Sequence, residues 1–253
     1  MEENNNKVKN NKIIAMIPAR IGSERLKYKN LALINKKPLI YYSINAAKKS
    51  KVFQNIILNS DDKIFKKIAD RYKINFYLRP KKIGSSKTKS DDVVYDFIKN
   101  FPNFDIIVWV NPIAPLIDYK DIKNVINFFD KKKLDSLITS EEKKVHSIFK
   151  NKSLNFKKKE KFKKTQDLEP IKLFSYSLMI WRVKSFIKDY EIKKSAILCG
   201  KFLDYPIESQ KSVIIKNVND LKLAELIMKN KSTNKKIVKY DKIMRLYVKK
   251  NKI

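Results

Sequence analysis

The stretch Ile13-Ile14-Ala15-Met16-Ile17-Pro18-Ala19-Arg20-Ile21-Gly22-Ser23-Glu24-Arg25 begins as an apolar run and becomes a polar, cationic loop. The apolar run is typical of a buried strand that ends near its proline. In an open α/β sheet, ligands bind at loops that leave the carboxyl ends of strands. A loop with Arg20, Ser23, Arg25 and, further on, Lys29 is suited to a phosphate group. An ordinary surface turn is the alternative interpretation of these residues.

Downstream of this loop, short apolar runs alternate with amphipathic helical patterns. The most apolar run, residues 106–110, is bounded by helical patterns, which indicates a parallel sheet covered on both faces. The alternation predicts an α/β fold with a doubly wound, mostly parallel sheet. The expected strands are 13–17, 55–59, 74–78, 106–110, 136–139, 176–181 and 202–205, and the expected helices are 39–49, 63–72, 90–98, 122–129 and 220–228.

A lysine-rich stretch with scattered aromatic residues interrupts the alternation at residues 143–164. We expect this stretch to leave the sheet as a hairpin arm or as a flexible loop. Residues 12–229 are expected to form one domain, since no repeat or linker divides them. The termini, 1–11 and 230–253, are basic and lack clear periodicity, so we expect them to be flexible or simply docked on the domain.

The chain of 253 residues carries 58 Lys and Arg against 26 Asp and Glu, which gives a net charge of +32. Only six of these cations are arginines, and the lysines are spread along the whole chain. Because specific base readout relies on arginine and on recognisable modules, we expect no specific nucleic-acid partner. Weak, salt-sensitive adsorption to polyanions is expected for such a charge.

Cysteine and histidine, which supply most disulfides and zinc sites, occur once each, as Cys199 and His146. This count excludes an intramolecular disulfide and disfavours a histidine-based zinc site. No apolar run approaches the roughly 18 residues that cross a bilayer, and the first twelve residues do not resemble a secretory signal. We therefore expect a cytoplasmic protein without membrane insertion.

The order of short motifs along the chain resembles that of the acylneuraminate cytidylyltransferases, which synthesise CMP-sialic acid and related CMP-nonulosonates. The likeness begins in the loop from Arg20 to Arg25, continues at Lys29-Asn30 and extends from about residue 12 to 228. The later matching segments are Arg79-Pro80, Thr88-x-Ser90-x-x-Val93, Asn111-Pro112-x-x-Pro115-Leu116, His146, Gln166-Asp167-Leu168 and Asp220-Leu221-x-x-Ala224-Glu225. Such an ordered set is far more specific than a lone glycine loop.

This resemblance implies a nucleotidyltransferase that activates a keto-sugar acid of the sialic, legionaminic or pseudaminic type with CTP, for surface polysaccharide synthesis. The sugar's anomeric 2-hydroxyl would attack the α-phosphate and release pyrophosphate. It also implies a homodimer in which an arm, at about residues 143–174, lies at a shared site where Gln166 faces the sugar acid. By resemblance, the nucleotide would contact Arg20, Ser23, Arg25, Lys29, Asn30, Arg79, Ser90 and Asn111.

The chain departs from the family pattern where the family holds Mg²⁺, the cofactor expected by resemblance. The family's Asp-x-Asp pair corresponds, by counting back from the last helix, to Ile214 and Lys216, and neither side chain is a magnesium ligand. We hypothesise that the Lys216 ammonium replaces part of the metal's charge and acts with Arg20 and Lys29 in catalysis. Metal ligands thus remain unknown. Four other aspartates are candidates, although each is expected to be a helix cap or a surface group: Asp61, Asp62, Asp91 and Asp92.

Further departures lie in the phosphate loop and on the sugar side. Glu24 replaces a lysine, Lys27 or Tyr28 a glycine, Ile117 and Thr165 an arginine, and Ser175-Tyr176 an Asn-Gly pair. A tyrosine follows a glycine backbone into positive φ only with strain. Two alternatives to the active enzyme therefore stay open. One is a catalytically weakened relative that binds nucleotide or serves as a structural partner, and the other is a nucleotidyltransferase with a different sugar or nucleotide.

Overall fold

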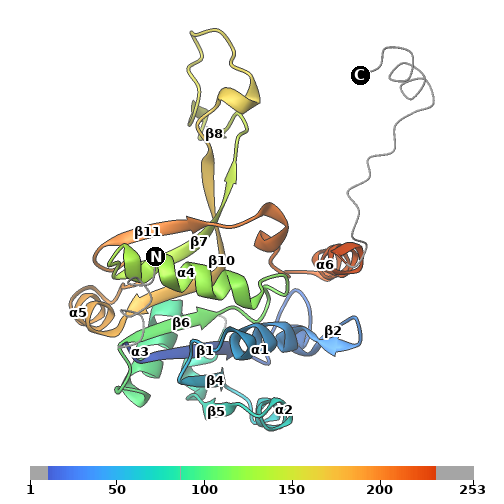
Figure 1. Cartoon of the computed structure of the whole chain (residues 1–253), viewed down its shortest axis with the longest axis vertical. Helices are drawn as coiled ribbons and strands as arrows, with labels where there is room; N and C mark the ends of the chain where they lie inside the picture. The colour runs from blue at the N-terminus through green and yellow to red at the C-terminus, as the bar shows by residue number, and fades with distance from the viewer. Residues whose placement is uncertain (1–10, 86, 232–253) are drawn as a thin grey trace, which may run out of the picture.

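Seven strands form one central sheet in the order β11-β7-β10-β6-β1-β4-β5 (Figure 1). The computed structural model describes residues 11–85 and 87–231. Neighbouring strands are parallel except at β10, which is antiparallel to both β6 and β7. The predicted mostly parallel α/β sheet is confirmed. Its strands are β1 Ile13–Ala19, β4 Asn55–Ser60, β5 Asn75–Leu78, β6 Ile106–Val110, β7 Ser136–Lys143, β10 Ile171–Arg182 and β11 Phe202–Pro206.

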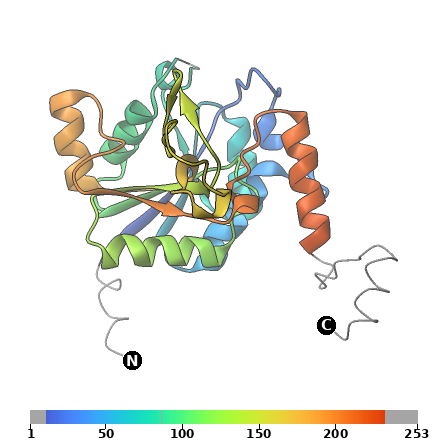
Figure 2. The same ribbon diagram turned by 90° about the horizontal axis from the view of Figure 1, so that it is seen from above.

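Helices cover both faces of this sheet, which explains why β1 is apolar throughout. Ile13, Ala15 and Ile17 pack in the core on one face with α1, α2 and α4, whereas Ile14 and Met16 pack on the other with α3 and α5. Figure 2 shows α4 on one side of the sheet and α3 and α5 on the other. The helices are α1 Leu39–Ser50, α2 Ile64–Tyr72, α3 Ser90–Asn100, α4 Tyr119–Lys131, α5 Val183–Lys193 and α6 Val218–Lys231.

Two features of the second half of the chain were not expected. Helix α5 buries Val183, Phe186 and Tyr190, a stripe too short to stand out among its charged residues. Strand β10 begins five residues earlier than expected, because its first residues continue the pairing with β7. Across the described part of the chain, no helix is long and apolar enough to cross a membrane. The predictions for the termini concern residues 1–10 and 232–253, which lie outside the described residues.

Between β7 and β10 the chain leaves the sheet as a hairpin arm, which we define as residues 144–170 (Figure 1, β8). Two short strands, β8 Ile148–Phe149 and β9 Lys152–Ser153, pair in antiparallel fashion within the arm. The His146 ring stacks on Phe162 with the ring centroids 3.8 Å apart. Of the two forms expected for this segment, the hairpin arm is therefore the one that forms.

A small hairpin follows the phosphate loop and leads the chain into α1. Its strands are β2 Leu33–Ile34 and β3 Lys37–Pro38, joined by Asn35 and Lys36 with φ of 47° and 64°. Two consecutive residues of positive φ are the usual connection for a two-residue hairpin. Ile34 packs with Leu39, Leu116, Ile215 and Ala224 in a small core, which attaches α6 to the domain.

Candidate active site

The parallel strands β5, β4, β1 and β6 end at the same edge of the sheet, and the loops that follow them surround one cavity of about 310 Å³. The strand order reverses at this point, since the chain passes from β1 to β4 and β5 and then returns to pair β6 with the other side of β1. Such switch points are where open α/β sheets bind ligands. Seven of the eight residues predicted to contact nucleotide line the cavity: Arg20, Ser23, Lys29, Asn30, Arg79, Ser90 and Asn111.

The loop after β1 is held in place by Asn30, which is buried and donates from Nδ2 to the carbonyl oxygen of Arg20 at 3.3 Å. Asn30 belongs to a short 3-10 turn that also contains Lys29. Tyr28 precedes this turn with φ of 54°, at one of the two positions where a family glycine was expected. At Gly22, an added Cβ would meet nothing within 4 Å. Packing against the protein therefore does not require a glycine at this position.

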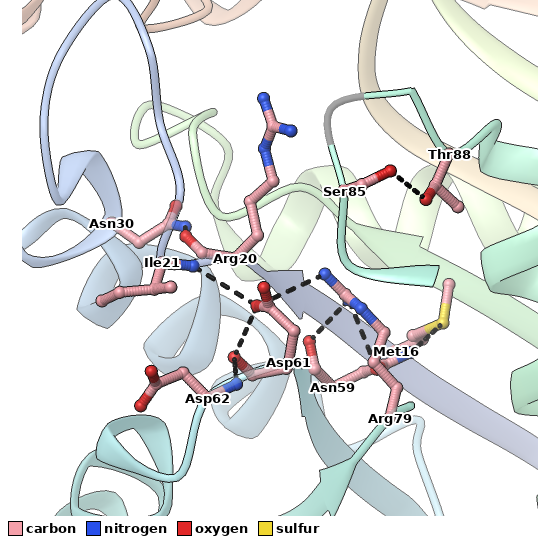
Figure 3. Close-up of polar contacts among 11 residues, drawn as sticks. Met16, Arg20, Ile21, Asn30, Asn59, Asp61, Asp62, Arg79, Ser85 and Thr88 are labelled. Atoms are coloured by element: carbon pink, nitrogen blue, oxygen red, sulfur yellow. Dashed lines mark hydrogen bonds and ion pairs between the residues drawn. The ribbon is translucent and has the colours of Figure 1, made fainter. Parts of the chain in front are cut away.

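Asp61 connects three of the loops around the cavity (Figure 3). One of its carboxylate oxygens, Oδ1, accepts a hydrogen bond from the Ile21 amide at 3.3 Å and lies 3.8 Å from Nη2 of Arg79. A Cβ at Gly84 would lie only 2.5 Å from the Asp61 Cβ, so the loop after β5 packs directly on this side chain. The expectation that Asp61 caps a helix is wrong. The adjacent Asp62 instead accepts from the first amide of α2, that of Ile64, at 2.8 Å.

Sequence reasoning missed the role of Asp61 because an aspartate before a helix is most often a cap. A signal was nevertheless present in the two consecutive aspartates. They follow a buried parallel strand directly, at the same edge of the sheet as Arg20 and Arg79. Of two such neighbours, one can cap the helix while the other turns toward the strand ends.

Arg79 is the most deeply buried cation at the cavity, with 5% of its surface exposed. Its Nη1 donates to the backbone and side-chain oxygens of Asn59 at 3.1 and 3.4 Å. Burial lowers the pKa of the Arg79 guanidinium, and the nearby Asp61 opposes this shift. Three lining residues retain a buried polar atom without a partner among the described residues: Nε of Arg79, Oδ1 of Asn30 and Nε1 of Trp109. Because buried polar atoms are normally paired, these three atoms favour a bound ligand.

Positive charge gathers around Lys29. Burial lowers the pKa of its ammonium, Arg25, Arg20 and Lys216 lower it further, and Asp220 raises it. Arg25 and Lys216 therefore lie close enough to act on Lys29, although they do not line the cavity. A group of cations with this arrangement, two of them partly buried and two exposed, attracts a polyanion such as a triphosphate.

Asn111 joins the end of β6 to the antiparallel strand β10. Its amide donates to the carbonyl of Ser177 at 3.1 Å, and its Nδ2 donates to the carbonyl of Tyr176 at 2.9 Å. Tyr176 has φ of 55°, so the chain keeps the backbone expected for glycine despite the tyrosine. A left-handed conformation costs a non-glycine residue about 1 kcal/mol, and the bonds from Asn111 hold it there.

The two aspartates at the start of α3 bind the region of α5 and are neither caps nor surface groups, so that expectation is wrong as well. Asp91 accepts hydrogen bonds from the amides of Ala196 and Ile197 at 2.6 and 3.1 Å. Asp92 accepts from the Tyr190 hydroxyl at 2.6 Å, and burial together with this bond raises the pKa of Tyr190 to about 12. Both carboxylates hold α3 in place, and Ser90 is the first residue of that helix.

Gln166 and Ile214 are not at the cavity. Gln166 is exposed on the arm, where its carbonyl accepts from Nζ of Lys144 at 2.8 Å. Ile214 packs against the core, and the amide of the next residue, Ile215, donates to the carbonyl of the lining residue Ile113 at 2.9 Å. Within residues 11–85 and 87–231, no group of three or more His, Cys, Asp or Glu residues could hold a metal ion. The described residues therefore offer no site that would hold magnesium by protein ligands alone.

The chain is similar in sequence to a known family and to several known proteins. A family model described as cytidylyltransferase matches residues 14–237. An N-acylneuraminate cytidylyltransferase of Escherichia coli O18:K1:H7 is 31% identical over 118 residues, which are 47% of this chain and 28% of that protein. The post-translational flagellin modification protein B of Campylobacter coli is 25% identical over 241 residues, 88% of this chain and 98% of that protein. The chain spans less than half the length of the curated N-acylneuraminate cytidylyltransferases that it matches.

Among solved structures, CMP:2-keto-3-deoxy-manno-octonic acid synthetase complexed with CTP has a similar fold. It superposes with a TM-score of 0.64 over 87% of this chain and 99% of that chain, at 13% sequence identity. At this identity the likeness supports the fold alone.

Proposed function

Since the chain belongs to the cytidylyltransferase family, we propose that it transfers a CMP group from CTP to a keto-sugar acid of the sialic, legionaminic or pseudaminic type. The observation that carries the proposal is the convergence of seven predicted nucleotide-binding residues on one cavity at the switch point of the sheet. Three buried, unpartnered polar atoms in the same wall support a bound ligand there. The names of the relatives point to sugar acids as acceptors.

The proposed reaction is an in-line transfer at phosphorus. The oxygen of the sugar's anomeric hydroxyl forms a bond to the α-phosphorus of CTP, while the bond from that phosphorus to the bridging oxygen of the β-phosphate breaks. Pyrophosphate leaves with the bonding electrons, and the hydroxyl proton passes to solvent. Charge develops mainly on phosphate oxygens, so positioned cations and N–H donors supply most of the stabilisation.

The roles proposed for individual residues follow from their places around the cavity. Arg20 and Lys29, on the loop after β1, would bind the triphosphate, with Arg25 near them and Ser23 as a hydroxyl donor. Asn30 would keep this loop in position through its bond to the Arg20 carbonyl. The remaining predicted residues, Arg79, Ser90 and Asn111, would surround the cytidine, since they come from the neighbouring strand ends and from the start of α3.

The sugar side of the proposal involves a second subunit. Gln166 is exposed on the arm and is absent from the wall of its own chain's cavity. We place it at the cavity of the partner in a homodimer, where an exposed amide on a projecting hairpin would contact the sugar acid. CTP is a cytoplasmic metabolite, so the proposal locates the reaction in the cytoplasm.

The proposal is tested by incubating the purified chain with CTP and a panel of keto-sugar acids and measuring pyrophosphate release and the CMP-sugar product. We expect release with at least one sugar acid, and CTP to support it far better than UTP. The Lys29→Ala variant should abolish release, whereas Lys222→Ala, on the exposed surface of α6, should leave it unchanged. Selective CTP binding without release under any sugar would instead favour the weakened, nucleotide-binding relative.

A further inference from the structure

A metal ion bound beside a triphosphate is normally held by carboxylates of the protein, and the cavity is instead lined by cations. Arg20, Lys29 and Arg79 line the cavity, and within the described residues no aspartate or glutamate does. Four cations around the phosphate loop also form no salt bridge or side-chain hydrogen bond in the described part of the chain: Arg20, Arg25, Lys29 and Lys216. Arg79, in contrast, already contacts Asp61 and Asn59.

Besides the exposed Glu24 in the phosphate loop itself, two carboxylates near these cations contact other groups of the protein. Asp220 accepts from the amides of Lys216 and Asn217 at 2.7 and 3.0 Å, and so caps the start of α6. Asp61 accepts from the Ile21 amide, faces Arg79 and is covered by Gly84. These contacts fix the orientation of both carboxylates, and magnesium requires near-ideal octahedral geometry around it.

The segment between β11 and α6 offers side chains of the wrong kind for a metal. Ile214 packs against the core and Ile215 is fully buried, which fixes the backbone of this segment beside the lining residue Ile113. Lys216 follows and is exposed on the side where it acts on Lys29. The position that could carry a carboxylate toward the phosphates therefore carries an ammonium.

We propose that the chain's own cations neutralise the triphosphate and the leaving pyrophosphate, so that nucleotide binding needs no divalent metal. This inference rests on the proposed function, since it concerns CTP at the same cavity. A triphosphate is a polyanion, and Arg20, Arg25, Lys29 and Lys216 place four positive charges around its site against one carboxylate in the same loop, Glu24. Lys216 occupies one of the two positions where the resemblance placed a metal-binding aspartate, and it acts as a binding cation just before α6.

The test is a calorimetric titration of CTP into the full chain, once in EDTA and once in excess Mg²⁺. The variants are Lys216→Ala, Lys216→Asp and the matched control Lys222→Ala, and both positions are exposed, so the fold should tolerate each change. For the unaltered chain we expect dissociation constants that agree within about twofold in the two buffers. Lys216→Ala should weaken binding in EDTA about tenfold, as for loss of one charge-assisted contact, and Lys222→Ala should not.

Lys216→Asp is the most informative of the three variants, because it removes a cation and introduces a hard oxygen ligand. We expect it to bind CTP poorly in EDTA and about tenfold or more tightly in Mg²⁺. The proposal is overturned if the unaltered chain binds CTP only in Mg²⁺, or if Lys216→Ala and Lys222→Ala behave alike. Failure of the proposed function has a different signature, namely no CTP binding by the unaltered chain in either buffer.

Discussion

The loops around the cavity and the projecting arm differ in how their predicted residues are placed. At the cavity, residues from four parts of the chain meet because parallel strands carry their carboxyl ends to one edge of the sheet. On the arm, Gln166 matches the resemblance equally well but lies exposed on a hairpin that has left the sheet. Thus a motif on a strand end can be located from the sheet alone, whereas the arm of a single chain does not show what Gln166 contacts, and its site at a partner subunit is our proposal.

The largest effect should come from removing the side chain that connects the cavity loops. Asp61→Ala would leave the buried Arg79 without its carboxylate and the Ile21 amide without an acceptor. Breaking a buried pair in this way costs about 3 kcal/mol of unfolding free energy, measured by urea denaturation. Asp61→Asn keeps an acceptor and should lose less. A loss below about 1 kcal/mol for Asp61→Ala would show that the loops are held by other contacts.

Next in size is the loss of nucleotide binding in Lys29→Met. A charge-assisted bond to phosphate contributes about 2 to 3 kcal/mol, so CTP should bind about a hundredfold more weakly. The stability of the unliganded chain should not fall, because the change removes a half-buried ammonium near three other cations. Unchanged CTP affinity would remove Lys29 from the nucleotide site.

The same residue predicts a pH dependence with a definite sign. The pKa of Lys29 is lowered from the ordinary 10.5 in the folded chain, so just below pH 10.5 the unfolded chain binds more protons. The free energy of unfolding therefore rises as the pH increases toward 10.5. At neutral pH, where Lys29 is charged in both states, its burial near other cations lowers the free energy of unfolding by the full amount. In urea denaturation, the free energy of unfolding of the unaltered chain should rise relative to that of Lys29→Met between neutral pH and about pH 10.5. A difference independent of pH would contradict the assigned shift.

A smaller effect is expected on the arm, where a substitution should change sugar binding without changing nucleotide binding. Gln166→Ala is expected to raise the KM for the sugar acid about tenfold, as for one lost hydrogen bond in a site, and to leave CTP affinity unchanged. Lys152→Ala, exposed elsewhere on the arm, is the control.

Subunit mixing tests whether the arm serves the partner's cavity. A mixed dimer of Gln166→Ala and Lys29→Met subunits has one site with both residues intact, so mixing the two weak variants should restore turnover. If mixing restores nothing while both variants still dimerise, Gln166 serves its own chain or none.

The smallest effects concern backbone strain, which occurs near the cavity, on the arm and at the ends of helices. The chain has three glycines, and ten non-glycine residues in its described part have positive φ. Lys51 at the end of α1 and Lys133 after α4, with φ of 56° and 51°, are two of them. Replacing either with glycine should raise the unfolding free energy by about 0.5 to 1 kcal/mol, and the gains should add. A loss of stability in either variant would mean that its side chain makes a contact that outweighs the strain.

The sequence predicted the sheet and five of the six helices in the described part of the chain, because periodicity determines them. The residues of the loop after β1 were predicted from their charge, whereas Arg79, Ser90 and Asn111 were predicted from the family resemblance alone. It missed α5, whose buried stripe of Val183, Phe186 and Tyr190 is short. It also misassigned Asp61, Asp91 and Asp92, since local sequence favours capping while their real partners lie on other elements, well separated in the chain. Partners that tertiary packing alone brings together cannot be read from neighbours in the chain.

The nucleotide site is tested most directly by the thermal midpoint of the chain with CTP, UTP, ATP and GTP in turn, beside the same series for Lys29→Met. A ligand at one hundred times its dissociation constant adds about 2.7 kcal/mol to native stability. We predict a clear upward shift with CTP, smaller shifts with the other three nucleotides, and loss of the CTP shift in Lys29→Met. No shift with CTP, or equal shifts with all four nucleotides that survive in Lys29→Met, would contradict a cytidine nucleotide site at this cavity.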